Sequence, residues 1–296
     1  MKRTMKKLLY FLAAAVTTLS MAASCILNFG GNGAVWVGNC TETGIDYTEV
    51  REVGPFREVA TSLPANVYYV QADRQEVRVE STEEFAPKVQ TTVEDGKLSL
   101  KMEPGRYSKL ILRVVVSSPD IEMLSVSGSG NLVHEGDLHA SGGLSLKVSG
   151  SGDLMAGRID SKDFSARCSG SGRIRAEGVR CDDFDGTVSG SGSMRLGSVS
   201  CDGFAAAISG SGGFSVDALT AKGDATARIS GSGGIHLDEV TVDGDMELKT
   251  SGSGGIRVNG SCRDVTAVTS GSGSISGGLE YRSINTKKSG SGHVSL

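Results

Sequence analysis

The hydrophobic positions of this chain recur with two periods, a short one of two residues and a long one of about twenty. The long period is marked by the tetrapeptide Ser-Gly-Ser-Gly, whose nine copies follow one another at steps of 19 to 22 residues. A fixed period near twenty over more than half of the chain indicates a stack of similar units, each burying its apolar face against its neighbours. The copies begin at Ser127, Ser149, Ser169, Ser189, Ser209, Ser230, Ser251, Ser270 and Ser289.

Within each unit the apolar residues alternate with polar ones. The fifth residue after the first serine is apolar in every copy, from Leu132 to Val294, and the residue that follows it is mostly polar. A second alternating run, such as residues 184–188, ends each unit, and a shorter run such as residues 240–242 lies between the two. Alternation with period two is typical of strands, so we predict three short strands per unit. The predicted fold is all-β, a parallel β-helix or β-solenoid with coils of about 20 residues.

The repeated Gly-x-Gly needs its own explanation, because glycine weakens an extended segment. It indicates either that opposite walls approach too closely for a Cβ atom, or that the corner needs a positive φ. A column of phenylalanines, one at the start of each second run, is expected to stack in the core rather than to bind a ligand. Its members are Phe164, Phe184 and Phe204.

Residues 48–126 lack the tetrapeptide but contain further alternating runs separated by turn residues. We predict that they form a cap or the first, degenerate coils of the repeat body at 127–296, which makes 48–296 one continuous domain. A separate small β-domain is the alternative. Leu296 ends the chain one strand into the ninth copy, which leaves a strand edge that favours edge-to-edge self-association.

The N-terminus has the features of an export signal. Four basic residues lie within the first seven, residues 8–20 form an apolar stretch too short to span a bilayer, and small residues precede Cys25. We predict a lipoprotein-type signal peptide at 1–24 and a membrane anchor through lipid on Cys25; a signal cleaved nearby without lipidation is the alternative. Residues 25–47, rich in Gly and Asn, are expected to be a tether.

The charge balance argues against nucleic acid as a partner. Residues 1–24 contain four of the 30 Lys and Arg residues and none of the 34 Asp and Glu residues, so the rest of the chain carries a net charge of −8. A polyanion is repelled by such a chain on average.

The sequence carries no recognisable catalytic or cofactor motif. It has no nucleophile elbow, no phosphate-binding loop and no C-x-x-C, and its four histidines are scattered, so we predict no catalytic residues, no cofactor and no metal site. Cys181 and Cys201 occupy the same position in consecutive units. They are expected to form either a disulfide or two buried thiols.

One outward-facing column carries positive charge, and it consists of Arg175, Arg195, His236 and Arg257. Acidic residues, among them Glu177 and Asp217, lie two positions further along. Either these charges offset one another as a solvated lattice of ion pairs, or the arginines form a groove for an anionic or hydroxylated glycan.

Four segments together resemble a known family, the putative auto-transporter adhesin, head GIN domain family of Bacteroidetes. The resemblance covers about residues 48–296. It implies an exported β-solenoid, often lipid-anchored, with no established enzymatic activity. The segments are Val50-Arg-Glu-Val-Gly-Pro-Phe56-Arg-Glu-Val59, Asp95-Gly-Lys-Leu98, Pro119-Asp-Ile-Glu-Met-Leu124 and Val126-Ser-Gly-Ser-Gly130.

We therefore expect a non-catalytic, lipid-anchored protein of the outer membrane, facing the cell surface or the periplasm. Its expected role is an adhesin-like module that binds a glycan or a surface protein. A periplasmic structural or assembly protein is the alternative. A polysaccharide-degrading enzyme is less favoured, since the carboxylates do not cluster as that chemistry requires.

Overall fold

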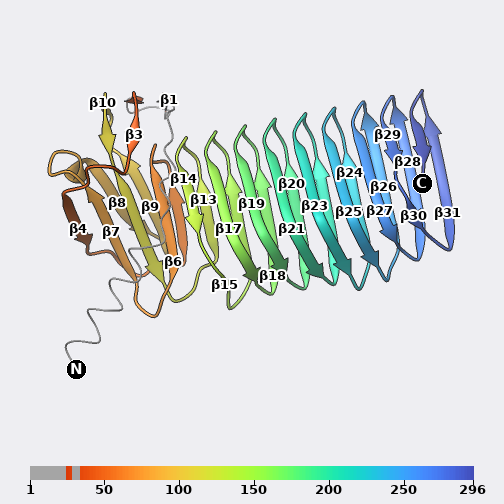
Figure 1. Cartoon of the computed structure of the whole chain (residues 1–296), viewed down its shortest axis with the longest axis horizontal. Coiled ribbons are helices and arrows are strands. Elements are labelled where there is room, and N and C mark those ends of the chain that lie inside the picture. The colour runs from red at the N-terminus through yellow and green to blue at the C-terminus, as the bar shows by residue number, and fades with distance from the viewer. Residues whose placement is uncertain (1–24, 29–33) are drawn as a thin grey trace.

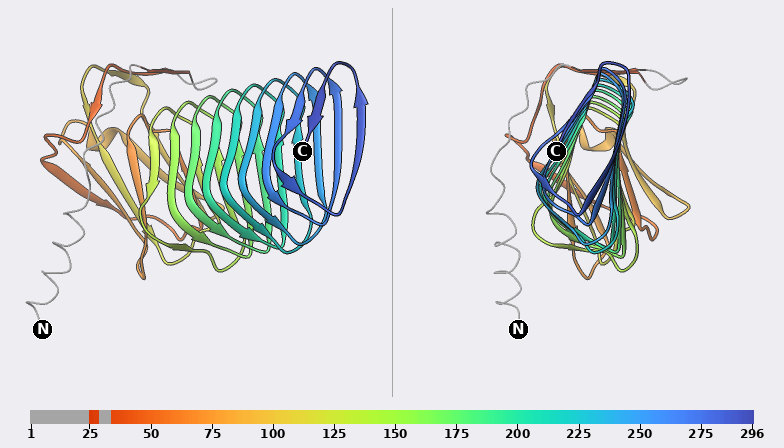
Figure 2. Two further views of the ribbon diagram at one scale, coloured as in Figure 1. Left: turned by 45° about the vertical axis from the view of Figure 1, so that its right-hand side comes forward. Right: turned by 90° about the vertical axis from the view of Figure 1, so that its right-hand side faces the viewer.

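The structure is a computed structural model that describes residues 25–28 and 34–296. The expected signal peptide at 1–24 lies outside these residues. The chain is a β-solenoid of stacked coils whose strands run across the long axis of a rod (Figure 1). Viewed along that axis, the two walls of the rod lean together into a narrow wedge (Figure 2). The predicted fold class is confirmed.

Two sheets form the walls, and in the repeat body their strands pair in parallel and in register with the coils on either side. The long sheet contains β14 (Asn131–His134), β15 (Leu138–His139), β17 (Asp153–Asp160), β19 (Arg173–Arg180), β21 (Ser193–Cys201), β23 (Gly213–Ala221), β25 (Gly234–Val242), β27 (Gly255–Ser261), β29 (Ser274–Ser276), β30 (Leu279–Glu280) and β32 (His293–Ser295). The short sheet contains β13 (Met123–Val126), β16 (Leu144–Val148), β18 (Asp163–Cys168), β20 (Asp183–Val188), β22 (Gly203–Ile208), β24 (Ala225–Ile229), β26 (Met246–Gly252), β28 (Asp264–Gly271) and β31 (Ser283–Ser289).

The prediction of three strands per coil is wrong for the central coils, which have two. In β17 and β19 the pairing passes from Ala156 and Ala176 directly to Arg158 and Gly178. The pairing skips one residue in each coil, and the strand bends at that residue. The strand does not end there, because the residues on either side stay paired with the neighbouring coils. The first two runs separate only in the terminal coils, as β14 and β15 and as β29 and β30.

The tetrapeptide corners are tight because consecutive coils touch there. A Cβ atom built on Gly152 or Gly172 would overlap the carbonyl oxygen of the equivalent glycine one coil earlier. The nearest contact is with the adjacent coil, but a Cβ atom on Gly172 would also lie 2.8 Å from Val148 Cγ1 of the short sheet, so the walls approach closely here as predicted. The predicted positive φ occurs in three of the copies, at Gly252, Gly271 and Gly290. Main-chain bonds hold the corner, as where the Gly172 N–H donates to the Gly150 carbonyl at 3.1 Å. All but one of the tetrapeptide serines are exposed.

The core fills the space between the two walls. Equivalent inward-facing residues of successive coils stack on one another and form columns along the rod. The predicted phenylalanine column lies there, with Phe164, Phe184 and Phe204 at most 3% exposed. The ring centroids of Phe184 and Phe204 are 5.0 Å apart and nearly parallel, while Phe214 from the facing wall meets both rings edge-on at 6.3 Å. Such stacks add specific geometry to apolar burial.

Both sheets continue into the N-terminal block. The long sheet extends through β6 (Asn66–Gln71) and β12 (Arg113–Ser118) to the antiparallel strands β7 (Glu76–Ser81) and β4 (Tyr47–Arg51). The short sheet extends through β5 (Glu58–Thr61) and β9 (Lys97–Met102) to antiparallel β8 (Val89–Glu94), with the 3₁₀ turn η1 (Ala86–Lys88) before it.

The expected tether is partly folded, which corrects the sequence interpretation. Strand β2 (Ala34–Val37) pairs with β1 (Cys25–Asn28) and β10 (Gly105–Tyr107), and β3 (Cys40–Thr41) pairs with β11 (Leu110–Ile111). These pairings satisfy backbone groups that a free linker would leave to water. In the described part of the chain, no helix has the length and apolar character needed to cross a bilayer.

Candidate functional site

The predicted arginine column lies on the outer face of the long sheet. Arg175 on β19 pairs directly with Arg195 on β21, and His236 on β25 pairs with Arg257 on β27. Ser215 on β23 separates the two pairs. All four column side chains are exposed because they occupy outward positions, whose inward neighbours on each strand fill the core. Parallel strands hold such neighbours at a spacing of ~4.8 Å.

The acidic neighbours neutralise little of this charge. Arg195 Nη2 lies 3.4 Å from Asp217 Oδ1, but the two side chains are 68% and 52% exposed. An ion pair in that setting is weak. Within the described ranges, Arg175 and Arg257 form no ion pair, so the predicted lattice consists of one contact.

Three further arginines surround the start of the column, and sequence reasoning did not single them out. Arg173 donates three hydrogen bonds to the mostly buried Asp153, two from Nε at 3.0 Å and one from Nη2 at 2.7 Å. Arg158 on β17 and Arg180 on β19 lie beyond the bend and are exposed. The sequence feature that could have identified Arg158 and Arg180 is their outward position in the short middle run of each unit. We call the surface of these three residues together with Arg175 and Arg195 the arginine face.

A hollow of about 330 Å³ lies on the long sheet beyond the bend. We call it the Gly178 hollow, after the glycine at its centre. Its polar lining comes from four consecutive coils, at β15, β17, β19 and β21, and from the loop before β15. The lining includes Asp137, His139, Arg158, Asp160, Arg180, Ser198 and Ser200.

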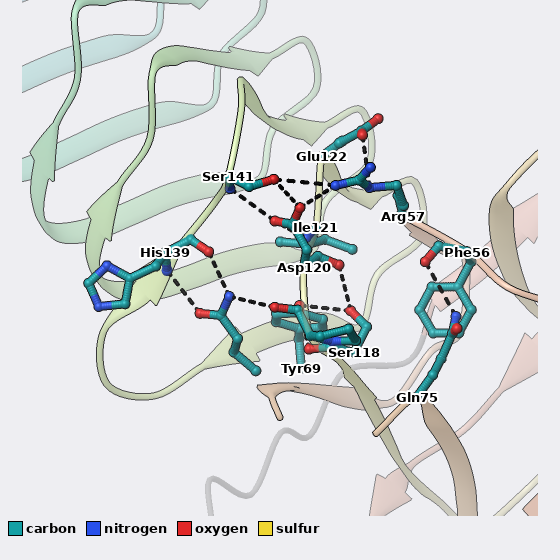
Figure 3. A network of polar contacts seen from close by, with 12 residues as sticks. Phe56, Arg57, Tyr69, Gln75, Ser118, Asp120, Ile121, Glu122, His139 and Ser141 are labelled. Atoms are coloured by element: carbon teal, nitrogen blue, oxygen red, sulfur yellow. Dashed lines mark hydrogen bonds and ion pairs between the residues drawn. The ribbon is translucent and has the colours of Figure 1, made fainter. Parts of the chain in front are cut away.

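A polar network joins the N-terminal block to the first coils beside this hollow (Figure 3). Asp120 accepts hydrogen bonds from the Ile121 N–H and the Ser141 N–H, both at 3.0 Å, and from the Ser141 hydroxyl and Arg57. Burial alone would raise the pKa of Asp120. These donors outweigh burial and lower the pKa to about 2, because they stabilise the carboxylate.

Cys181 and Cys201 lie on consecutive coils, as the repeat requires, and both are free, buried thiols in this structure. Burial raises the pKa of each thiol to about 12, which disfavours the reactive thiolate. Their disulfide stays a prediction. Cys25, the predicted site of lipidation, is the first residue of β1. Among residues 25–28 and 34–296, no cluster of three or more His, Cys, Asp or Glu side chains is placed to hold a metal ion.

Comparison with solved structures shows the same fold in other proteins. A putative adhesin from Parabacteroides distasonis ATCC 8503 is 19% identical, with a TM-score of 0.62 over 84% of this chain and 95% of that chain. A putative adhesin from Parabacteroides merdae ATCC 43184 is 17% identical, with a TM-score of 0.54 over 86% and 97%. A putative lipid binding protein from P. distasonis ATCC 8503 is 17% identical, with a TM-score of 0.50 over 86% and 98%.

At these identities the likeness shows the fold alone. The comparison with curated proteins gives no match. The family described as "putative auto-transporter adhesin, head GIN domain" matches residues 55–239, more than half of the chain and including all five residues of the arginine face. The protein belongs to this family of putative auto-transporter adhesins with a head GIN domain.

Proposed function

We propose that the protein is an exported, lipid-anchored, non-catalytic binding module that holds an anionic glycan on the arginine face. The observation that carries the proposal is the pair Arg175 and Arg195, which lie side by side on adjacent strands of the long sheet, with one weak ion pair, from Arg195 to Asp217 on the next coil. Membership of a family of putative adhesins supports a binding role.

The chemistry of the face suits a polymer with regularly spaced acidic groups. A guanidinium group donates two parallel hydrogen bonds to a carboxylate or sulfate, and a rigid sheet holds several guanidinium groups in fixed relation. Acidic residues elsewhere on the chain oppose this binding only weakly, because most of them lie far from the arginine face. At physiological ionic strength, charges more than about 8 Å apart are largely screened.

Binding to heparin, which repeats carboxylates and sulfates, tests the proposal. We expect the protein without residues 1–24 to bind immobilised heparin and not neutral dextran. Arg175→Ala with Arg195→Ala should weaken heparin binding at least ~10-fold, since each lost charge-assisted contact contributes on the order of 1 kcal/mol. Surface plasmon resonance at two salt concentrations measures both effects.

A matched control removes the same charge from the opposite wall. Arg167 on β18 and Arg228 on β24 are exposed residues of the short sheet, each in an ion pair. Arg167→Ala with Arg228→Ala should leave heparin affinity within ~2-fold of the wild type. Equal losses in the two double variants would mean that net charge, and not the arginine face, controls binding.

Anchoring through Cys25 is the second part of the proposal, and cell fractionation tests it. The full chain with a C-terminal tag should remain with the outer membrane, whereas Cys25→Ser should be released in soluble form, because one residue carries the lipid. Protease added to intact cells should remove the tag if the rod faces outward. Protection until the outer membrane is opened would favour the alternative role, a periplasmic structural protein.

A further inference from the structure

The Gly178 hollow exists because one coil lacks a side chain at an outward position. Arg158, Gly178, Ser198 and Ala218 succeed one another in register on β17, β19, β21 and β23. A Cβ atom on Gly178 would lie 3.8 Å from Arg158 Cγ and 2.7 Å from Ser198 Oγ. The glycine backbone is therefore the floor between these two side chains.

The neighbouring register adds a second row of polar groups. His139, Asp160, Arg180 and Ser200 follow one another on β15, β17, β19 and β21. The two rows bring two guanidinium groups, two carboxylates including Asp137, and hydroxyl groups around one hollow.

These charged groups are not used to hold the fold together. In the described part of the chain, neither Arg158 nor Arg180 forms an ion pair, and neither do the carboxylates of Asp137 and Asp160. By contrast, Arg173 on the same face donates three hydrogen bonds to Asp153. Unengaged donors and acceptors that surround a hollow are available to a ligand.

The rim of the hollow is held in place from the N-terminal block. Gln71 Nε2 donates to the His139 carbonyl at 2.6 Å, and the His139 N–H donates to Gln71 Oε1 at 2.9 Å. Both bonds engage the backbone of His139, and its imidazole points away from the network (Figure 3). The ring is thus free to line the hollow.

We propose that the Gly178 hollow binds a single uronic acid residue of an acidic polysaccharide. Arg158 and Arg180 supply donors to the sugar carboxylate, and Asp137 and Asp160 accept hydrogen bonds from its hydroxyl groups. A volume of about 330 Å³ lies at the small end of the range for ligand sites, about 300–1,000 Å³, which suits one ring. The inference rests on the proposed function, because the polymer continues from the hollow over Arg175 and Arg195.

Filling the hollow from its floor tests the proposal without removing any lining group. Gly178 is not in the left-handed region, and other coils carry Arg, Ser and Ala at this position, so Gly178→Leu is expected to fold. Ala218→Leu is the matched control, since it places the same side chain in the same column two coils away. The probe is hexagalacturonate, with maltohexaose as the neutral comparison, in isothermal titration calorimetry.

We expect the wild type and Ala218→Leu to bind hexagalacturonate alike, and Gly178→Leu to bind at least ~10-fold more weakly. Arg158→Gln with Arg180→Gln, which keeps the floor open, should cause a similar loss. Equal affinity of Gly178→Leu and Ala218→Leu would overturn the hollow as the site. If heparin binding still depends on Arg175 and Arg195 in that case, the proposed function stands alone. Equal binding of maltohexaose would overturn the acidic specificity, and no binding of any of these probes by the wild type would overturn both proposals.

Discussion

At the scale of the single residue, Asp120 joins parts of the chain that are far apart in sequence. It accepts hydrogen bonds from Arg57 of the N-terminal block and from Ser141 of the first coil. Arg57 also lies 2.9 Å from Glu122, so one guanidinium connects two carboxylates of the lead-in to β13. The junction of block and repeat body therefore depends on a charged group whose protonation state matters.

The low pKa of Asp120 predicts a specific pH dependence of stability. Its pKa of about 2 in the folded protein is below the ordinary value of 3.8, so the carboxylate favours folding above pH 4. That contribution is lost as the pH falls from 4 through 2. Because solvent screens the site, we expect Asp120→Asn to cost only ~1 kcal/mol of unfolding free energy at pH 7.

Urea unfolding at pH 7 and at pH 2 measures this difference. The gap between Asp120→Asn and the wild type should be much smaller at pH 2, where the wild-type carboxyl is about half protonated in the folded protein and almost fully protonated in the unfolded chain. Asp238→Asn, at an exposed carboxylate with no ion pair in the described residues, should show no gap at either pH. A gap that is independent of pH would show that Asp120 acts by packing and not by charge.

Residues that repeat in every coil can be predicted from the sequence, whereas residues that act at one place in the chain are harder to predict. The stack of Phe164, Phe184 and Phe204 follows from the period alone, because a fixed repeat places equivalent residues on adjacent coils. The contact of Asp120 with Arg57 does not follow, since both residues lie in the segment 48–126, which lacks the repeat. Gly178 is also hard to predict, because a missing side chain matters only when its neighbours in other coils are known.

At the scale of the element, the alternating pattern predicts strands but not where they end. The runs at 154–156 and 159–160 are both strands, yet they form the single bent strand β17. Glycine at the junction is equally compatible with a turn and a bend. The deciding factor is pairing with β19, which is a contact between units and leaves no local mark in the sequence.

The bend also explains why the candidate site was only partly predicted. Arg175 and Arg195 lie before it, in a column that can be aligned by counting from the tetrapeptide. Arg158 and Arg180 lie after it, where one residue per coil drops out of the pairing. The bend sets the two outer surfaces at an angle, and the Gly178 hollow lies on the part beyond it.

At the scale of the whole molecule, the open end of the rod decides whether copies stack. Strand β31 forms the edge of the short sheet, and every one of its residues is exposed. Register with β28 places Ile284, Thr286 and Lys288 in the columns that are apolar or small in earlier coils. The sequence predicts self-association at this edge, but a lysine in an inward column is a device that opposes strand pairing.

We therefore expect Lys288 to limit the association of two rods through their open ends. Thr269 on β28 pairs with Lys288, and its buried hydroxyl has no hydrogen-bond partner in the described chain. A second rod stacked on this end would bury the charged ammonium group of Lys288, at a high cost in free energy. The wild type without residues 1–24 should be monomeric at concentrations up to ~100 μM, whereas Lys288→Val should dimerise in sedimentation velocity as the apolar column is extended. Lys249→Val, two coils earlier on the outer face, removes the same charge and should stay monomeric. Equal dimerisation of wild type and Lys288→Val would mean that the edge pairs despite its lysine, as the sequence alone predicts.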